Sequence, residues 1–277
     1  MKIVGIDFTS APSRRKPLTC AVCELDDRSL RFIHLSSWST FEGFEAALAN
    51  VGPWVAGLDF PFGQATRFIQ TMPWPGEWID YVRHSGTFDR RTFRSALDEY
   101  KAGRPVGDKE HRRVFDVLAS SISPQKLYGV PTGMMFFEGT KRLLSSGVDI
   151  PGLVAGDPSR TVFEAYPGVA ARSLLGRRSY KTDDQRKQNP LHRAARLELL
   201  GALCSEPGRT LYDIDIEAPE SLCDDPGADH LDALICAIQA AWAWRHLDAC
   251  LAELPAEAAR EGWIADPTLF GRPRGNG

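Results

Sequence analysis

The 277-residue sequence has no long hydrophobic run, and this absence excludes whole classes of protein. No stretch reaches the roughly 18 uninterrupted apolar residues that a membrane-spanning helix needs. The N-terminal MKIVGIDF becomes acidic too early for the apolar core of a signal peptide. Cysteines are also sparse, with six in the chain, which fits a reducing compartment. We therefore expect a cytoplasmic protein that does not associate with membranes.

Two common catalytic motifs are missing as well. The chain has no G-x-x-x-x-G-K-[ST] loop, which P-loop enzymes use to bind phosphates, and no G-x-S-x-G turn, which carries the nucleophile of many hydrolases. Cys20 and Cys23 form a C-x-x-C pair in LTCAVCEL, a segment typical of a strand. Because no second pair completes a zinc site, we expect both cysteines to be structural.

No strong excess of charge is present, since the formal net charge is −3. This value favours neither a nucleic-acid coat nor a membrane-surface protein. The distribution is uneven, however, because residues 172–196 hold eight Lys or Arg against Asp183 and Asp184. The segment carries +6, which leaves −9 for the rest of the chain. We predict that Lys181, Arg186 and Arg193 contact substrate phosphates, the alternative being a solvated loop and helix face.

What the sequence does contain is a series of short apolar runs typical of strands. They span residues 2–8, 18–25, 29–38, 53–63 and 160–168. Asp26-Asp27-Arg28 separates the second run from the third and predicts a hairpin, so that the first three strands form a meander. Segments with apolar residues at helical spacing, or apolar for most of their length, lie at 41–51, 133–147, 190–204 and 228–247. This order predicts an α/β fold.

Residues 64–125 differ in character, with prolines, aromatic residues and arginines scattered among one another. We expect a largely helical insertion at about 64–130 within a single domain of residues 1–250. Arginines interleaved with aromatic rings suit single-stranded nucleic acid, but the rings can equally form the insertion's own core. Residues 251–277 are expected to form a C-terminal extension that ends in a disordered GRPRGNG tail.

Acidic residues stand at the ends of three predicted strands, at Asp7, Asp59 and Glu164. In sheets with parallel strands this end is where ligands bind. Asp229 and Asp232 open the last long helix and, three residues apart, share one face of it. Converging carboxylates repel one another unless a cation neutralises them, and hard oxygen ligands select Mg²⁺ or Mn²⁺. We therefore predict a divalent-metal site formed by the aspartates.

Each acid also has a simpler explanation. Asp7 and Asp59 precede turn-forming residues and can serve as turn hydrogen-bond acceptors, while Asp229 can cap its helix. Asp232 is harder to explain in this way, because it lies in a helix that is apolar for most of its length. His230, beside the acids, is a candidate for proton transfer, the alternative being a structural histidine.

The motifs GIDFTSAP, GLDFPF, FEAYPG and DHLDALICA, within residues 2–245, resemble the domain-of-unknown-function 429 family. That family is regarded as predicted nucleases. The resemblance implies a ribonuclease-H-like mixed five-stranded sheet flanked by helices, with the insertion after the fourth strand. Asp229-x-x-Asp232-Ala233 is also similar to the last motif of RuvC-type Holliday-junction resolvases. By that likeness Asp7 is the first-strand metal ligand, Asp59 stands where those enzymes carry Glu, and Glu164 falls outside the four-acid pattern as an outer partner.

These observations predict a nuclease in which the four aspartates hold two divalent ions, Mg²⁺ or Mn²⁺, and hydrolyse DNA or RNA. Two alternatives stay open. An actin-like, ATP-dependent phosphotransferase also places Asp after its first strand, although the segment FTSAP at residues 8–12 lacks the glycine-rich turn that wraps phosphates. A non-catalytic nucleic-acid-binding module of the same fold would bind without a metal. The sequence indicates neither an oligomeric state nor a choice between DNA and RNA.

Overall fold

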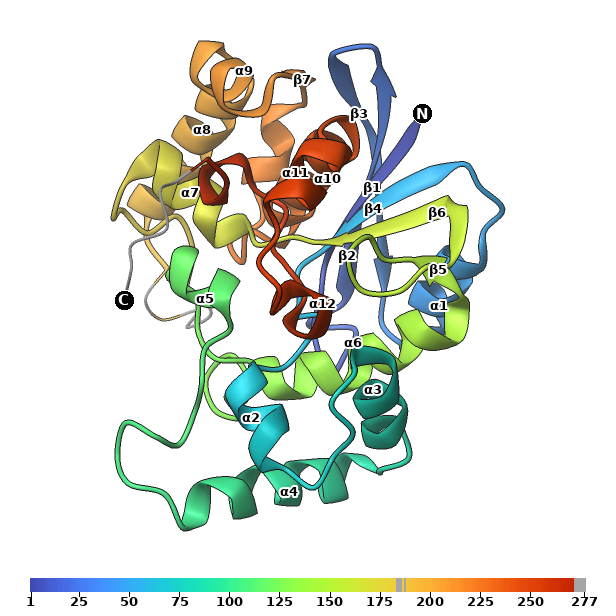
Figure 1. The fold of residues 1–277 in the computed structure, drawn as a ribbon. Coiled ribbons are helices and arrows are strands. Elements are labelled where there is room, and N and C mark those ends of the chain that lie inside the picture. Colours follow the sequence, from blue (N-terminus) through green and yellow to red (C-terminus); the bar gives the residue numbers. More distant parts are fainter. Residues whose placement is uncertain (183–185, 187, 272–277) are drawn as a thin grey trace.

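The computed structural model describes residues 1–182, 186 and 188–271, and a mixed sheet lies at its centre (Figure 1). In this part of the chain the sheet has seven strands in the order β5-β6-β4-β1-β2-β3-β7. The strands are β1 (Lys2–Asp7), β2 (Leu18–Asp26), β3 (Ser29–Trp38), β4 (Trp54–Leu58), β5 (Val148–Asp149), β6 (Asp157–Glu164) and β7 (Asp215–Glu217). Asp183, Asp184 and Lys187 of the basic segment, and the 272–277 tail, lie outside the described residues.

The sheet combines antiparallel and parallel strands. Strands β1, β2 and β3 form an antiparallel meander, and β4 and β6 then add in parallel on the other side of β1. All five strands expected from the apolar runs are present. The expected number of five is nevertheless wrong, because β5 and β7 pair in parallel with β6 and β3 at the two edges. They have two and three residues, too few for an apolar pattern to reveal them.

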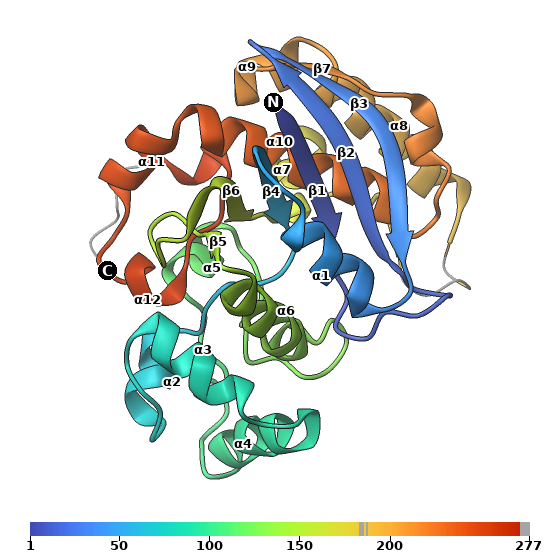
Figure 2. The same cartoon turned by 90° about the vertical axis from the view of Figure 1, so that its right-hand side faces the viewer.

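Helices cover both faces of the sheet (Figure 2). One face carries α10 (Asp229–Arg245), with α7 (Pro167–Leu175), α8 (Pro190–Leu203), α9 (Glu206–Tyr212) and α11 (Leu247–Glu253). The other face carries α1 (Phe41–Ala49) and α6 (Thr132–Ser146). Helices α1, α6, α8 and α10 confirm the four predicted from sequence. None of the helices in the described residues is long and apolar enough to cross a lipid bilayer.

The insertion is largely helical, as predicted, with α2 (Thr66–Thr71), α3 (Trp78–Gly86), α4 (Arg90–Ala102) and α5 (Val114–Leu118). Its aromatic rings pack on one another and on α6. The ring centroids of Phe68 and Trp74 are 5.4 Å apart, and those of Phe93 and Phe137 are 4.6 Å apart. Trp78 and Tyr81 are fully buried. These rings therefore form a core rather than a surface on which bases stack.

The C-terminal extension packs against the domain. It contains α12 (Ala258–Glu261) and the 3-10 turn η3 (Pro267–Leu269), while a second such turn, η2 (Glu220–Cys223), precedes α10. Ile264 forms a bridge with Glu164 at the end of β6, and the Ala265 N–H donates to the Glu164 carbonyl at 2.8 Å. Trp263 is buried, and its Nε1 donates to the Pro151 carbonyl. The extension thus covers the carboxyl end of β6.

Two glycines allow α10 to rest directly on the backbone of the sheet. A Cβ atom added at Gly5 of β1 would lie 1.9 Å from the Ala233 carbonyl oxygen and 2.3 Å from the Ala237 nitrogen. A Cβ atom at Gly57 of β4 would lie 2.1 Å from the Cys236 carbonyl oxygen. Such separations are impossible for any residue with a side chain. Glycine at both positions therefore sets the distance between α10 and the sheet.

We predict that Gly5→Ala destabilises the protein by about 3 kcal/mol, which is the upper end of the usual cost of overpacking a core. The cost is high because the added methyl group would clash with backbone atoms rather than with a side chain that can move. Gly201→Ala is the matched control. Gly201 lies exposed in α8 with open space around it, so an alanine there is expected to stabilise by about 0.5–1 kcal/mol. Urea unfolding measures the free energy of unfolding of both variants. Equal stability of Gly5→Ala and the wild type would contradict this packing of α10.

Candidate functional site

Asp7 and Asp59 lie side by side at the carboxyl ends of two neighbouring parallel strands. Ile6 pairs with Leu58 in the ladder, and the Asp59 N–H donates to the Ile6 carbonyl at 3.0 Å. Side chains alternate between faces along a strand, so Asp7 lies on the face of Gly5 and Asp59 on the face of Gly57. That face is the one covered by α10. Both carboxylates therefore lie on the side of the sheet where α10 begins.

The first turn of α10 presents two further carboxylates. Asp232 is completely buried, and Asp229 is 14% exposed. Asp229 is not the cap of its helix, because Ala228 occupies that position with a φ of 63°. The Asp225 carboxylate accepts a hydrogen bond from the Asp229 N–H at 2.6 Å instead. The side chain of Asp229 is therefore available to the site.

These carboxylates act on one another electrostatically. Burial, and then the negative charges of Asp229, Asp232 and Asp59, raise the pKa of Asp7 well above its usual value. Burial likewise raises the pKa of Asp59 to about 7, although the ammonium group of Lys181 opposes the shift. Burial also raises the pKa of Asp232. Each carboxylate thus makes ionisation of its neighbours more costly.

Two lysines neutralise part of this charge, and one tyrosine donates a hydrogen bond to it. Lys16, from the loop after β1, places its Nζ 2.7 Å from Asp229 Oδ1. Lys181 forms an ion pair with Asp232, and the Tyr180 hydroxyl donates to Asp232 Oδ1 at 2.7 Å. The two α10 acids are therefore paired with protein cations.

Asp7 and Asp59 have no such partners among the described residues. None of these residues donates a hydrogen bond to either carboxylate, although Asp7 is only 5% exposed. The turn explanation therefore fails for both. Asp7 is buried and Asp59 is partly exposed. A carboxylate that is largely shielded from water and has no donor is costly to ionise, and a bound cation would offset this cost. In residues 1–182, 186 and 188–271 no three Asp, Glu, His or Cys side chains lie grouped so that they could hold a metal ion as they stand.

Glu164 belongs to a different network. It is in register with Leu58, so it lies on the opposite face of the sheet from Asp59. Arg113 donates to Glu164 Oε2 through Nη1 at 2.7 Å and also binds Asp116, and the Phe62 N–H donates to Glu164 at 2.8 Å. All three charged side chains are buried. Glu164 thus joins the insertion to the sheet and remains an outer neighbour of the aspartates.

Arg193 and His230 form no hydrogen bond or ion pair with the four aspartates among the described residues. Arg193 on α8 is exposed and pairs with Asp224 at 2.7 Å, and Arg186 is exposed. His230 is partly exposed and makes no hydrogen bond with the aspartates among the described residues. Of the predicted phosphate contacts, Lys181 alone pairs with one of the four aspartates in that part of the chain.

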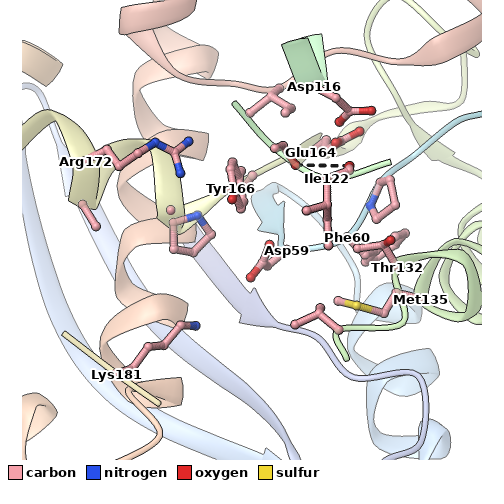
Figure 3. Close-up of a pocket in the computed structure, with 18 of the residues that line it drawn as sticks. Asp59, Phe60, Asp116, Ile122, Thr132, Met135, Glu164, Tyr166, Arg172 and Lys181 are labelled. Carbon is pink, nitrogen blue, oxygen red and sulfur yellow. Dashed lines mark hydrogen bonds between the residues drawn. The ribbon is translucent and has the colours of Figure 1, made fainter. Parts of the chain in front are cut away.

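Sequence reasoning missed two features, Lys16 and a cavity. The basic run Arg14-Arg15-Lys16, in the loop between the first two strands, was a signal for the lysine. The cavity, of about 630 Å³, opens beside Asp59 and Lys181 (Figure 3). Its walls come from α6, the start of α7, the basic segment and the loop after α5. No local pattern brings these segments together.

Because the pKa of Asp59 is raised to about 7, the metal-free protein takes up a proton there on folding between about pH 4 and pH 7. The unfolded chain binds fewer protons in this window, so this residue makes stability fall as the pH rises. We predict that the stability of Asp59→Asn decreases less with rising pH than that of the wild type. The variant should therefore be more stable than the wild type at pH 8. Urea unfolding at pH 5 to 8 with EDTA measures this, and Asp248→Asn, exposed on α11, should keep the wild-type slope. An unaltered slope in Asp59→Asn would contradict the raised pKa.

Comparison with known proteins gives one positive result. No curated protein matches the chain, and no solved structure matches it. One family model, described as "Protein of unknown function (DUF429)", matches residues 5–260. This match begins within β1 and ends within α12, so it includes all four aspartates, Glu164 and the insertion. It covers far more than half of the sequence, and the chain therefore belongs to the DUF429 family.

Proposed function

We propose that this protein is a metal-dependent nuclease that hydrolyses phosphodiester bonds in DNA or RNA. The observation that carries the proposal is the pair of adjacent carboxylates of Asp7 and Asp59, which face the acidic first turn of α10. Asp7 is buried, Asp59 is partly exposed, and neither has a hydrogen-bond donor among the described residues. The strand order β3-β2-β1-β4-β6, with a meander followed by parallel strands, supports the ribonuclease-H-like core that the family resemblance implies.

Asp7 and Asp59 would hold Mg²⁺ or Mn²⁺, and Asp229 and Asp232 would complete the ligand set once their lysines move away. Such ions, when bound, neutralise phosphate charge and lower the pKa of a water so that it can attack phosphorus. Carboxylate ligands must be deprotonated, so binding competes with the protons that the raised pKa values retain at Asp7 and Asp59. A two-ion site would remove the repulsion among all four acids.

Lys181 has a place in this proposal as a phosphate ligand. Its side chain is 39% exposed and lines the cavity, and its ammonium group pairs with Asp232. Lysine binds phosphate as a flexible point charge, so the ammonium group can exchange a carboxylate for a phosphate oxygen. Tyr180 is buried and keeps its hydrogen bond to Asp232 during this exchange. The basic segment around Lys181 would attract the polyanionic substrate.

Asp7→Asn tests the nuclease directly. We expect Mn²⁺-dependent cleavage of single-stranded and duplex substrates to fall by at least about 100-fold, since loss of groups that merely support a metal ligand already costs 10–100-fold. Asp248→Asn should cleave as the wild type does. Unchanged cleavage by Asp7→Asn would refute the mechanism. Metal-independent binding of nucleic acid without any cleavage would favour the non-catalytic module instead.

Lys181→Met tests whether the ammonium group of Lys181 competes with a divalent ion for Asp232. Removing its charge leaves Asp232 unpaired, so we expect Mn²⁺ to bind about tenfold more tightly, a gain of about 1.4 kcal/mol. The KM for a polynucleotide should rise, because a phosphate ligand is lost. Isothermal titration calorimetry with Mn²⁺ measures the first effect, with Lys109→Met, exposed in the insertion, as the control. Unchanged or weaker Mn²⁺ binding by Lys181→Met would show that Lys181 does not compete with the metal.

A further inference from the structure

The cavity beside the aspartates has the size of a ligand site. Its volume of about 630 Å³ lies within the roughly 300–1,000 Å³ of small-molecule pockets. Asp59 and Lys181 both line it, so a molecule held there has one end at the aspartates. The sheet and α10 position the aspartates, and neither needs this cavity in order to do so.

The cavity has two chemically different sides (Figure 3). Arg172 and Lys181 lie on one side, while Ile122 and Met135 lie on the other, with Tyr166 between them. Arg177 and Arg178 also line the cavity, and Arg178 pairs with Glu198. A ligand that fits has an anionic part next to an apolar part. A nucleotide has this form, since its phosphate is anionic and its base has flat apolar faces.

Tyr166 is held in place from several directions. Its N–H donates to Gln239 Oε1 at 2.9 Å, and Gln239 Nε2 donates to its carbonyl at 3.1 Å. The ring lies close over Gly168, where a Cβ atom would be 2.8 Å from Tyr166 Cζ. The Arg172 guanidinium lies 5.5 Å from the ring centroid. An aromatic ring fixed in this way can stack with a base at little entropic cost.

Three other charged residues of the lining do not call for a charged ligand, although Lys126 lines the cavity as a further cation. Arg113, Asp116 and Glu164 also border the cavity, but they are paired with one another. Their charges are balanced within the protein. This buried network therefore offers no free charge to a ligand, whereas the side that holds Lys181 and Arg172 carries cationic groups that a phosphate can approach once Lys181 exchanges its carboxylate partner.

We propose that the cavity holds one unstacked nucleotide, with its base between Tyr166 and the side chains of Ile122 and Met135, and its phosphate at Lys181 and Arg172. This inference rests on the proposed nuclease function and specifies its substrate as single-stranded or locally unpaired nucleic acid. A base inside a duplex is stacked and paired, so it can enter such a cavity only after it is flipped out. A phosphate bound at Lys181 lies beside Asp59, where the metal would act.

Binding in EDTA, where cleavage cannot occur, tests the cavity separately from the nuclease. We expect adenosine monophosphate to bind at least about tenfold more tightly than ribose 5-phosphate, because the base adds its own contacts. Ile122→Trp should weaken adenosine monophosphate binding at least about tenfold by filling the apolar side. Ile122 is 37% exposed, so the larger side chain can be accommodated without unfolding. Ile33→Trp, on β3 at 47% exposure, is the matched control and should bind as the wild type does.

Competition separates single strands from duplexes. A single-stranded oligonucleotide should displace adenosine monophosphate, and a blunt duplex of the same sequence should not. Equal affinity for adenosine monophosphate and ribose 5-phosphate, or wild-type binding by Ile122→Trp, would overturn the nucleotide cavity. Nucleotide binding as expected without any Mn²⁺-dependent cleavage would support the cavity and refute the nuclease. Cleavage that depends on Asp7 and is unaffected by Ile122→Trp would leave the nuclease standing and overturn the cavity.

Discussion

The seating of α10 on the bare backbone of β1 and β4 is the contact on which the candidate site depends. Gly5 and Gly57 have no Cβ atoms to hold the helix away, and Ala233 of the helix is small as well. The helix starts at the carboxyl ends of these strands, so this close approach also determines how near its first turn comes to Asp7 and Asp59. Larger residues at the glycines would move a whole acidic turn away from the strands, because a helix moves as a rigid unit.

This packing carries an electrostatic cost that the protein only partly offsets. Of the four carboxylates, Asp7 and Asp232 are buried while Asp59 and Asp229 are partly exposed, and burial raises the pKa of three of them. Lys16 and Lys181 pair with the two acids on α10, but the two acids on the strands keep no donor among the described residues. Stability alone would favour neutral side chains there. The proposed divalent ions would supply the positive charge that these two acids lack.

Periodicity and strand-end acids predicted the five main strands, the four main helices and the approach of the aspartates, because these follow from local patterns. The role of Glu164 could not be predicted in the same way. An acid at a strand end shares an edge with its neighbours, but its face depends on register, and pairing with Leu58 turns Glu164 away from Asp59. The partner of Asp229 is Lys16, 213 residues distant, which only the folded chain brings near.

The FEAYPG motif shows how the insertion is tied to the acids. Glu164 binds Arg113 of the insertion on one face of β6, and two residues later Tyr166 forms the wall of the cavity, with Gly168 making room for its ring. The buried ion pair thus ties the insertion to the end of β6. The loop of the insertion that carries Ile122 lines the same cavity as Asp59. Positioning of the acids therefore belongs to the sheet and α10, whereas access to them depends on the insertion. A change in the insertion can alter which molecules reach the aspartates without moving the aspartates themselves.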